Sequence, residues 1–280
     1  MTDPAGPNSA APAEVRHLPL ASGRDAILWH WAATIADPIG TILFSHGAQS
    51  APWKYDRLIQ PWRDAGYDIW APLHVDSLDH PLTADYPGLA TWQARLEDMH
   101  AAAALIDAPY VAAGHSYGAL TALVIGGARG DVPETFPAPL RDSRARCVLA
   151  FSPPPPIPGL ISPEGYAGIA VPALVQTGDC DLMPGWPDTG EGWRVHLPAY
   201  ELAPVGGDRY LLVLEGVDHT FGNAICEPTR EAPPQLAALA RAVEMAGMFL
   251  QAFYPQAKTE ARQKLDTRLT PDGPVRLERK

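Results

Sequence analysis

The chain has 280 residues, of which 46% are hydrophobic and 19% charged, and its formal net charge is −11 at pH 7. This composition predicts a folded globular protein with a substantial core and excludes a largely disordered chain. The negative charge argues against nucleic acid or an anionic membrane surface as a partner, because neither attracts a net anion.

The N-terminal segment, the apolar stretches and the cysteines indicate the compartment in which the protein is expected to lie. Residues 1–14 have neither the basic region nor the apolar region of a signal peptide, and no apolar stretch approaches the ~20 residues of a membrane span. We therefore expect a disordered leader at 1–14, a cytoplasmic protein and no membrane partner. Cys147, Cys180 and Cys226 are then expected to be free thiols, although Cys180 and Cys226 could meet in space.

The predicted elements alternate along the chain. Two opening strands and a buried strand precede a helix that Pro61 should kink or shorten. A later helix should be capped by Thr91. The strands are predicted at 15–20, 26–33, 41–44, 67–72, 110–114, 146–152, 172–178 and 209–216, and the helices at 54–66, 91–107, 116–128 and 234–253.

This alternation predicts an α/β fold with a mostly parallel central sheet of about eight strands and helices on both faces. The strands are apolar without clean alternation, as expected of parallel strands buried on both sides. No linker divides the chain, so we expect one domain over 15–256, followed by a C-terminal tail at 257–280. In such sheets the functional site lies at the carboxyl ends of the strands.

The most informative motif is G-x-S-x-G at 114–118, in "YVAAGHSYGAL". It falls between a predicted strand and a predicted helix, the context in which a sharp turn strains the backbone of the serine and lifts its hydroxyl clear of the sheet. The flanking Gly114 and Gly118 are expected because a Cβ there would collide with the neighbouring strand or helix. Ser116 is therefore the candidate nucleophile, at a helix N-terminus that favours negative charge.

A serine nucleophile needs a base and an acid that orients it, and on this type of elbow they follow in the order Asp or Glu, then His. His219 comes directly after the last strand and is the candidate base, whereas His196 lies in a proline-broken loop. Asp181 in "TGDCD" is the preferred acid, with Asp179 as the alternative that could instead hold the turn. Asp218 is poorly placed to orient its own neighbour.

The oxyanion hole needs two aimed N–H groups. The backbone N–H of Tyr117, directly after the serine, is one candidate, and that of Ala48 in "SHGAQS" is the other. His46 is expected to fix this loop by hydrogen bonding. His115 is expected to point away from the site into the flank of the sheet.

With these residues in place, "SHGA", "GHSYGA", "TGDCD" and "GVDHTFGN" make the chain resemble the α/β-hydrolases over about 15–254. More narrowly it resembles the dienelactone-hydrolase-like and platelet-activating-factor-acetylhydrolase-like branch. The resemblance implies a serine hydrolase that acts on small-molecule carboxylic esters through an acyl-enzyme, without cofactor or metal. Two departures matter. Dienelactone hydrolases use a cysteine nucleophile, so Ser116 does not imply lactone specificity. The short link between the strands that end near 152 and start near 173 predicts no large lid.

The substrate pocket is less defined. Trp53 follows the oxyanion loop and Trp186 follows the acid loop, so both are candidate pocket residues, with core packing as the alternative for each. Two other functions stay open: a ligand-binding receptor on a hydrolase scaffold, and an acyltransferase or hydroxynitrile lyase with the same triad. The sequence leaves the oligomeric state open.

Overall fold

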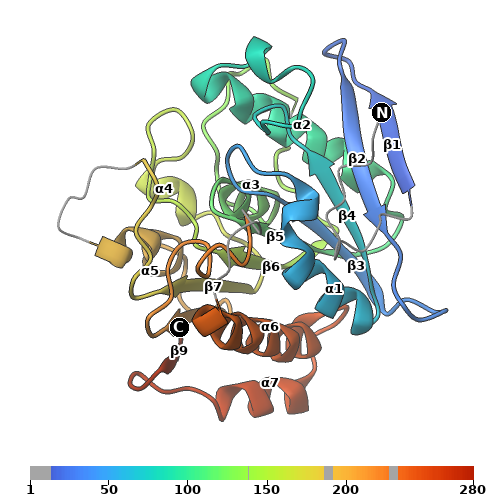
Figure 1. The fold of residues 1–280 in the computed structure, drawn as a ribbon. Helices are drawn as coiled ribbons and strands as arrows, with labels where there is room; N and C mark the ends of the chain where they lie inside the picture. Colours follow the sequence, from blue (N-terminus) through green and yellow to red (C-terminus); the bar gives the residue numbers. More distant parts are fainter. Residues whose placement is uncertain (1–13, 138, 186–191, 227–232) are drawn as a thin grey trace.

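The computed structural model describes residues 14–137, 139–185, 192–226 and 233–280. Its centre is a nine-stranded sheet in the order β1-β2-β4-β3-β5-β6-β7-β8-β9 (Figure 1). The strands are β1 (Glu14–Pro19), β2 (Asp25–Trp31), β3 (Gly40–Ser45), β4 (Tyr67–Leu73), β5 (Tyr110–His115), β6 (Ala145–Phe151), β7 (Ala173–Gly178), β8 (Arg209–Leu214) and β9 (Val275–Arg279). Strands β4, β3 and β5 to β8 are parallel, whereas β1, β2 and β9 are antiparallel to their neighbours.

Helices cover both faces of this sheet. One face packs against α2 (Thr91–Ala104) and α3 (Tyr117–Ile125), with the short α4 (Pro163–Tyr166) and α5 (Pro198–Glu201) beside them. The other face packs against α1 (Asp56–Asp64) and α6 (Pro233–Phe253), with α7 (Thr259–Asp266) outside α6 (Figure 1). This is the α/β-hydrolase fold, and the predicted fold class is confirmed.

The central strands are buried on both sides, which explains their continuous apolar sequences. Every residue of β5, β7 and β8 is buried. The residues between β6 and β7, 152–172, contain only the four-residue helix α4, so no large lid is inserted there.

Three sequence expectations need correction. Glu14 begins β1, so the predicted leader is one residue too long; residues 1–13 lie outside the described residues. The segment 257–280 is not a loose tail, because it forms α7 and β9, and β9 pairs with β8 along the edge of the sheet. Pro61 lies inside α1, which spans Asp56–Asp64 and is shorter than the predicted helix 54–66. Thr91 does not cap α2: its hydroxyl donates to the Gly88 carbonyl.

Among the described residues, α6 is the one helix long and apolar enough to cross a membrane by length and composition, over Gln235–Phe253. Its apolar side chains, such as Ala242, Ala246 and Phe249, are buried against the sheet. Of this window, 44% is buried inside the protein.

Candidate active site

Ser116 stands on a strained turn between β5 and α3. Its φ is 55° and its ψ is −121°, a combination that costs a non-glycine residue about 1–3 kcal/mol. The turn is tight: a Cβ on Gly114 would lie 2.2 Å from the Gly118 carbonyl oxygen, and a Cβ on Gly118 would lie 2.0 Å from the Ser45 carbonyl oxygen. The predicted steric need for both glycines is confirmed.

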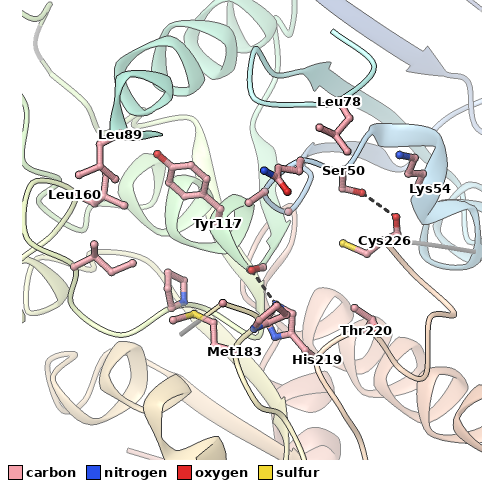
Figure 2. Close-up of a pocket in the computed structure, with 18 residues that line it drawn as sticks. Ser50, Lys54, Leu78, Leu89, Tyr117, Leu160, Met183, His219, Thr220 and Cys226 are labelled. Carbon is pink, nitrogen blue, oxygen red and sulfur yellow. Dashed lines mark hydrogen bonds between the residues drawn. The ribbon is translucent and has the colours of Figure 1, made fainter. Parts of the chain in front are cut away.

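The structure brings Ser116, His219 and Asp181 together from three strand ends. The Ser116 hydroxyl lies 2.9 Å from Nε2 of His219 (Figure 2). On the other side of the ring, Nδ1 of His219 donates to Oδ1 of Asp181 at 2.7 Å. Nδ1 therefore carries a proton, and the neutral ring leaves Nε2 free to accept the serine proton.

Asp181 is completely buried, and its carboxylate is satisfied on both oxygens. Oδ2 accepts hydrogen bonds from the hydroxyls of Ser152 at 2.6 Å and Thr177 at 2.8 Å. Oδ1 also lies 2.9 Å from Nε2 of His196. Burial alone would raise the pKa of Asp181, but the contacts with His196 and His219 outweigh it and hold that pKa well below its usual range, so the group is ionised.

The alternative acids hold loops instead. Asp179 accepts a hydrogen bond from the Gly216 N–H at 2.7 Å and pairs with Arg276 at 3.1 Å, as expected of a residue that holds its turn. Asp218 accepts from the N–H groups of Thr220 and Gly222 within its own loop.

The proposed oxyanion donors line the same cleft as Ser116. Within the described chain the backbone N–H groups of Ala48 and Tyr117 make no hydrogen bond, so both stay available to a bound group. As predicted, His46 fixes this loop: its Nδ1 donates to the Gly47 carbonyl at 2.7 Å, and its Nε2 accepts from the His74 N–H at 3.0 Å.

A buried ion pair, which sequence reasoning missed, anchors the loop that carries Ala48. Arg95 of α2 is fully buried and pairs with Asp76 through Nε at 2.7 Å and Nη2 at 2.8 Å. The same guanidinium donates to the carbonyls of His46 and Gly47, and Asp76 accepts from the Gln49 N–H at 3.0 Å. The loop is thus held from both sides of Ala48, which fixes the direction of its N–H.

His115 does not point away from the site, contrary to the sequence expectation. Its ring centroid lies 4.8 Å from that of His219. Its Nε2 donates to the His219 backbone carbonyl at 2.8 Å, and its Nδ1 accepts from the Tyr55 hydroxyl at 2.9 Å. Burial lowers the pKa of His115 to about 4, which agrees with a neutral ring in this tautomer.

The cleft over Ser116 has a volume of about 520 Å³ and two unlike sides. Leu89, Leu160 and Tyr117 form an apolar side, while the polar side chains of Ser50 and Lys54 lie with Leu78 on the opposite side (Figure 2). Lys54 is paired with Asp79 at 3.0 Å.

The sequence predictions for the pocket and the cysteines fare differently. Trp53 is not part of this lining, since it packs against Trp29 with ring centroids 4.4 Å apart; Trp186 lies outside the described residues. All three cysteines are free thiols. The Tyr55 hydroxyl lies 2.8 Å from Sγ of Cys226, while Cys180 is exposed.

Asp181, His196 and His219 are also the group of described residues whose donor atoms lie close enough together to hold a metal ion, within 4.8 Å. Their donor atoms already contact one another at 2.7 and 2.9 Å, and the remaining nitrogen of His219 faces Ser116. A metal would have to displace the protons of these contacts. The arrangement fits proton transfer better than metal binding.

No protein-family model matches the sequence, and no curated protein matches it. Solved structures do. A propionate-bound esterase, esterase 2 of the planctomycete Thermogutta terrifontis, is 18% identical, with a TM-score of 0.61, and the match covers 88% of this chain and 97% of the other. The same esterase phosphorylated by paraoxon is 21% identical, with a TM-score of 0.55, over 85% and 92%. A puromycin-hydrolysing peptidase of Mycobacterium tuberculosis is 14% identical, with a TM-score of 0.56, over 88% and 40%. These likenesses agree with the α/β-hydrolase fold.

Proposed function

We propose that this protein is a serine hydrolase that cleaves carboxylic esters, with Ser116 as nucleophile, His219 as general base and Asp181 as the acid that orients it. The observation that carries the proposal is the continuous contact from Ser116 Oγ to His219 Nε2 at 2.9 Å and from His219 Nδ1 to Asp181 Oδ1 at 2.7 Å. This is the arrangement that activates a serine for acyl transfer.

In the proposed reaction, His219 takes the proton of Ser116 as the serine oxygen attacks the ester carbonyl. The N–H groups of Ala48 and Tyr117 hold the negative oxygen of the tetrahedral intermediate. Collapse of the intermediate breaks the ester C–O bond, and His219 gives its proton to the departing alcohol. Water then attacks the acyl-serine while His219 takes its proton; as the bond between the acyl carbon and the serine oxygen breaks, His219 returns that proton to Ser116 Oγ and the acid is released.

The cleft supports a small or medium-sized ester with an apolar portion. Its volume lies within the range of small-molecule sites, and Leu89, Leu160 and Tyr117 offer an apolar wall. The charge of Lys54, the cation in the lining, is already paired with Asp79. The cleft therefore favours a neutral substrate over an anionic one.

Covalent labelling tests the nucleophile. Paraoxon should react so that Ser116 oxygen forms a bond to phosphorus and p-nitrophenolate leaves, and peptide mass spectrometry should place the diethylphosphoryl group on Ser116. Labelling should disappear in Ser116→Ala and persist in Ser22→Ala, a serine on the surface that bonds Glu97. Labelling of the Ser116→Ala variant at wild-type rate would overturn the assignment.

A further inference from the structure

A second histidine contacts the candidate acid from behind. His196 ends the short 3-10 helix Gly192–His196 and is fully buried. Its Nε2 lies 2.9 Å from Oδ1 of Asp181, and its Nδ1 lies 2.8 Å from the backbone carbonyl oxygen of Pro153. The ring is stacked beside that of His219, with centroids 5.5 Å apart.

Both neighbours of the His196 ring are acceptors. The Pro153 carbonyl cannot donate a hydrogen bond, and Asp181 is ionised because its other oxygen already receives two hydroxyls. A neutral imidazole has one N–H, so one of its two nitrogens would turn a lone pair toward an oxygen less than 3 Å away. Only the imidazolium form turns no lone pair toward either acceptor.

The contact with Asp181 also requires charge. Nε2 of His196 is buried and lies 2.9 Å from Oδ1 without the direction of a hydrogen bond, so the contact has the geometry of an ion pair. A buried polar nitrogen beside a carboxylate is costly unless a charge–charge attraction compensates for its lost hydration.

We infer that His196 is a buried, permanently charged imidazolium that shares Asp181 with His219, and that it acts as a positioning residue that lowers the proton affinity of the general base. The inference about function rests on the proposed esterase mechanism, whereas the charge state does not. The pKa directions agree: burial would lower the pKa of His196, but Asp181 outweighs burial and raises it.

The charged groups around His196 and His219 define the expected effect on the pKa of His219. In the described part of the chain, the titratable groups that act on His219 are Asp181 after β7, His196 at the end of the 3-10 helix Gly192–His196, and His115 at the end of β5. His115 is neutral, so the cation at His196 is the group that offsets the carboxylate of Asp181. It keeps His219 neutral, and able to act as a base, to lower pH.

The test is the pH dependence of kcat/KM for ester hydrolysis in His196→Gln. Glutamine keeps an N–H donor for one acceptor and removes the charge. Two charges about 5.5 Å apart at a buried site interact strongly enough to shift the pKa of His219 by on the order of one unit. The acidic limb of the plot of kcat/KM against pH should therefore move about one pH unit to higher pH in the variant. His17→Gln, on the exposed face of β1, should leave the limb in place. An unmoved limb in a folded His196→Gln protein would overturn the inference.

The charge state can be measured in the wild-type protein, which removes the dependence on folding of the variant. Nitrogen-15 NMR of the histidine rings should show His196 with two protonated nitrogens at pH 7. A ring with a single N–H would overturn the inference whether or not the chain hydrolyses esters. Two N–H groups in a protein without esterase activity would instead contradict the proposed function and leave the charge assignment standing.

Discussion

Nε2 of His115 donates a hydrogen bond to the backbone carbonyl of His219, 2.8 Å away. The other nitrogen accepts from Tyr55, whose hydroxyl in turn accepts from the Gly47 N–H at 2.9 Å. A chain of buried hydrogen bonds therefore connects the loop of the candidate base with the loop that carries Ala48. Both halves of the site are held by one network, although they are more than 170 residues apart in sequence.

Removing His115 should loosen the base without removing any reacting group. In His115→Phe the buried His219 carbonyl loses its donor, a change that costs about 1–3 kcal/mol. We expect kcat to fall roughly 10-fold to 100-fold with little change in KM. Tyr55→Phe is the matched comparison, since it keeps the ring in the core and removes only the hydroxyl; it should slow the enzyme less. Unchanged steady-state kinetics in His115→Phe would contradict a positioning role.

Asp181→Asn should reduce kcat by roughly four orders of magnitude, because the amide can no longer hold the productive tautomer of His219 or stabilise its charged form. Asp179→Asn is the control: it loses contacts with Gly216 and Arg276 but touches neither His219 nor Ser116, and should stay within about threefold of wild type. Steady-state hydrolysis of one ester by both variants decides between the two acids. The reverse order of effects would assign the acid to Asp179.

The pH dependence follows from His219. Burial lowers its pKa below the ordinary value of 6.5, although Asp181 partly compensates. Because the neutral ring is the active base, kcat/KM should be constant above this pKa and should fall as pH drops through it. We expect the midpoint of the acidic limb below pH 6.5. A midpoint above pH 7, or full activity retained at pH 4, would exclude His219 in this role.

The Arg95–Asp76 pair should contribute to the free energy of unfolding and to the way in which that free energy changes with pH. Burial would raise the pKa of Asp76, but Arg95 outweighs it and the pKa lies well below its usual range. Its contribution is therefore complete at pH 7 and is lost as pH falls from the unfolded-state pKa toward the folded one. Asp76→Asn leaves Arg95 buried without its partner, at a cost of about 3–5 kcal/mol at pH 7. Urea unfolding at pH 7 and pH 3 should show the difference from wild type shrinking in acid; a constant difference would contradict this.

Much of the fold and site could be predicted from the sequence because the signals are local. The elbow around Ser116 is encoded by two glycines four residues apart, and Asp181 and His219 lie in the loops that follow the apolar strands β7 and β8. The edge strand β9 was missed although "VRLER" alternates apolar and charged residues, a pattern typical of a half-buried strand.

The supporting residues could not be predicted in this way. His196 and Arg95 contact the site only through tertiary packing, and their flanking sequences are those of an ordinary loop and an ordinary helix. Trp53 is the reverse case: its place after the oxyanion loop predicted a pocket residue, but its ring packs against Trp29 and does not line the cleft.

The measurement that most directly tests the central claim is hydrolysis of p-nitrophenyl acetate, butyrate and octanoate by the wild-type chain and by Ser116→Ala. We predict many turnovers by the wild type, with a chain-length preference set by the apolar wall of the cleft, and loss of nearly all activity in the variant. A folded wild-type protein that binds these esters without turnover, or a Ser116→Ala variant as active as wild type, would contradict the account, the first outcome favouring a ligand-binding receptor.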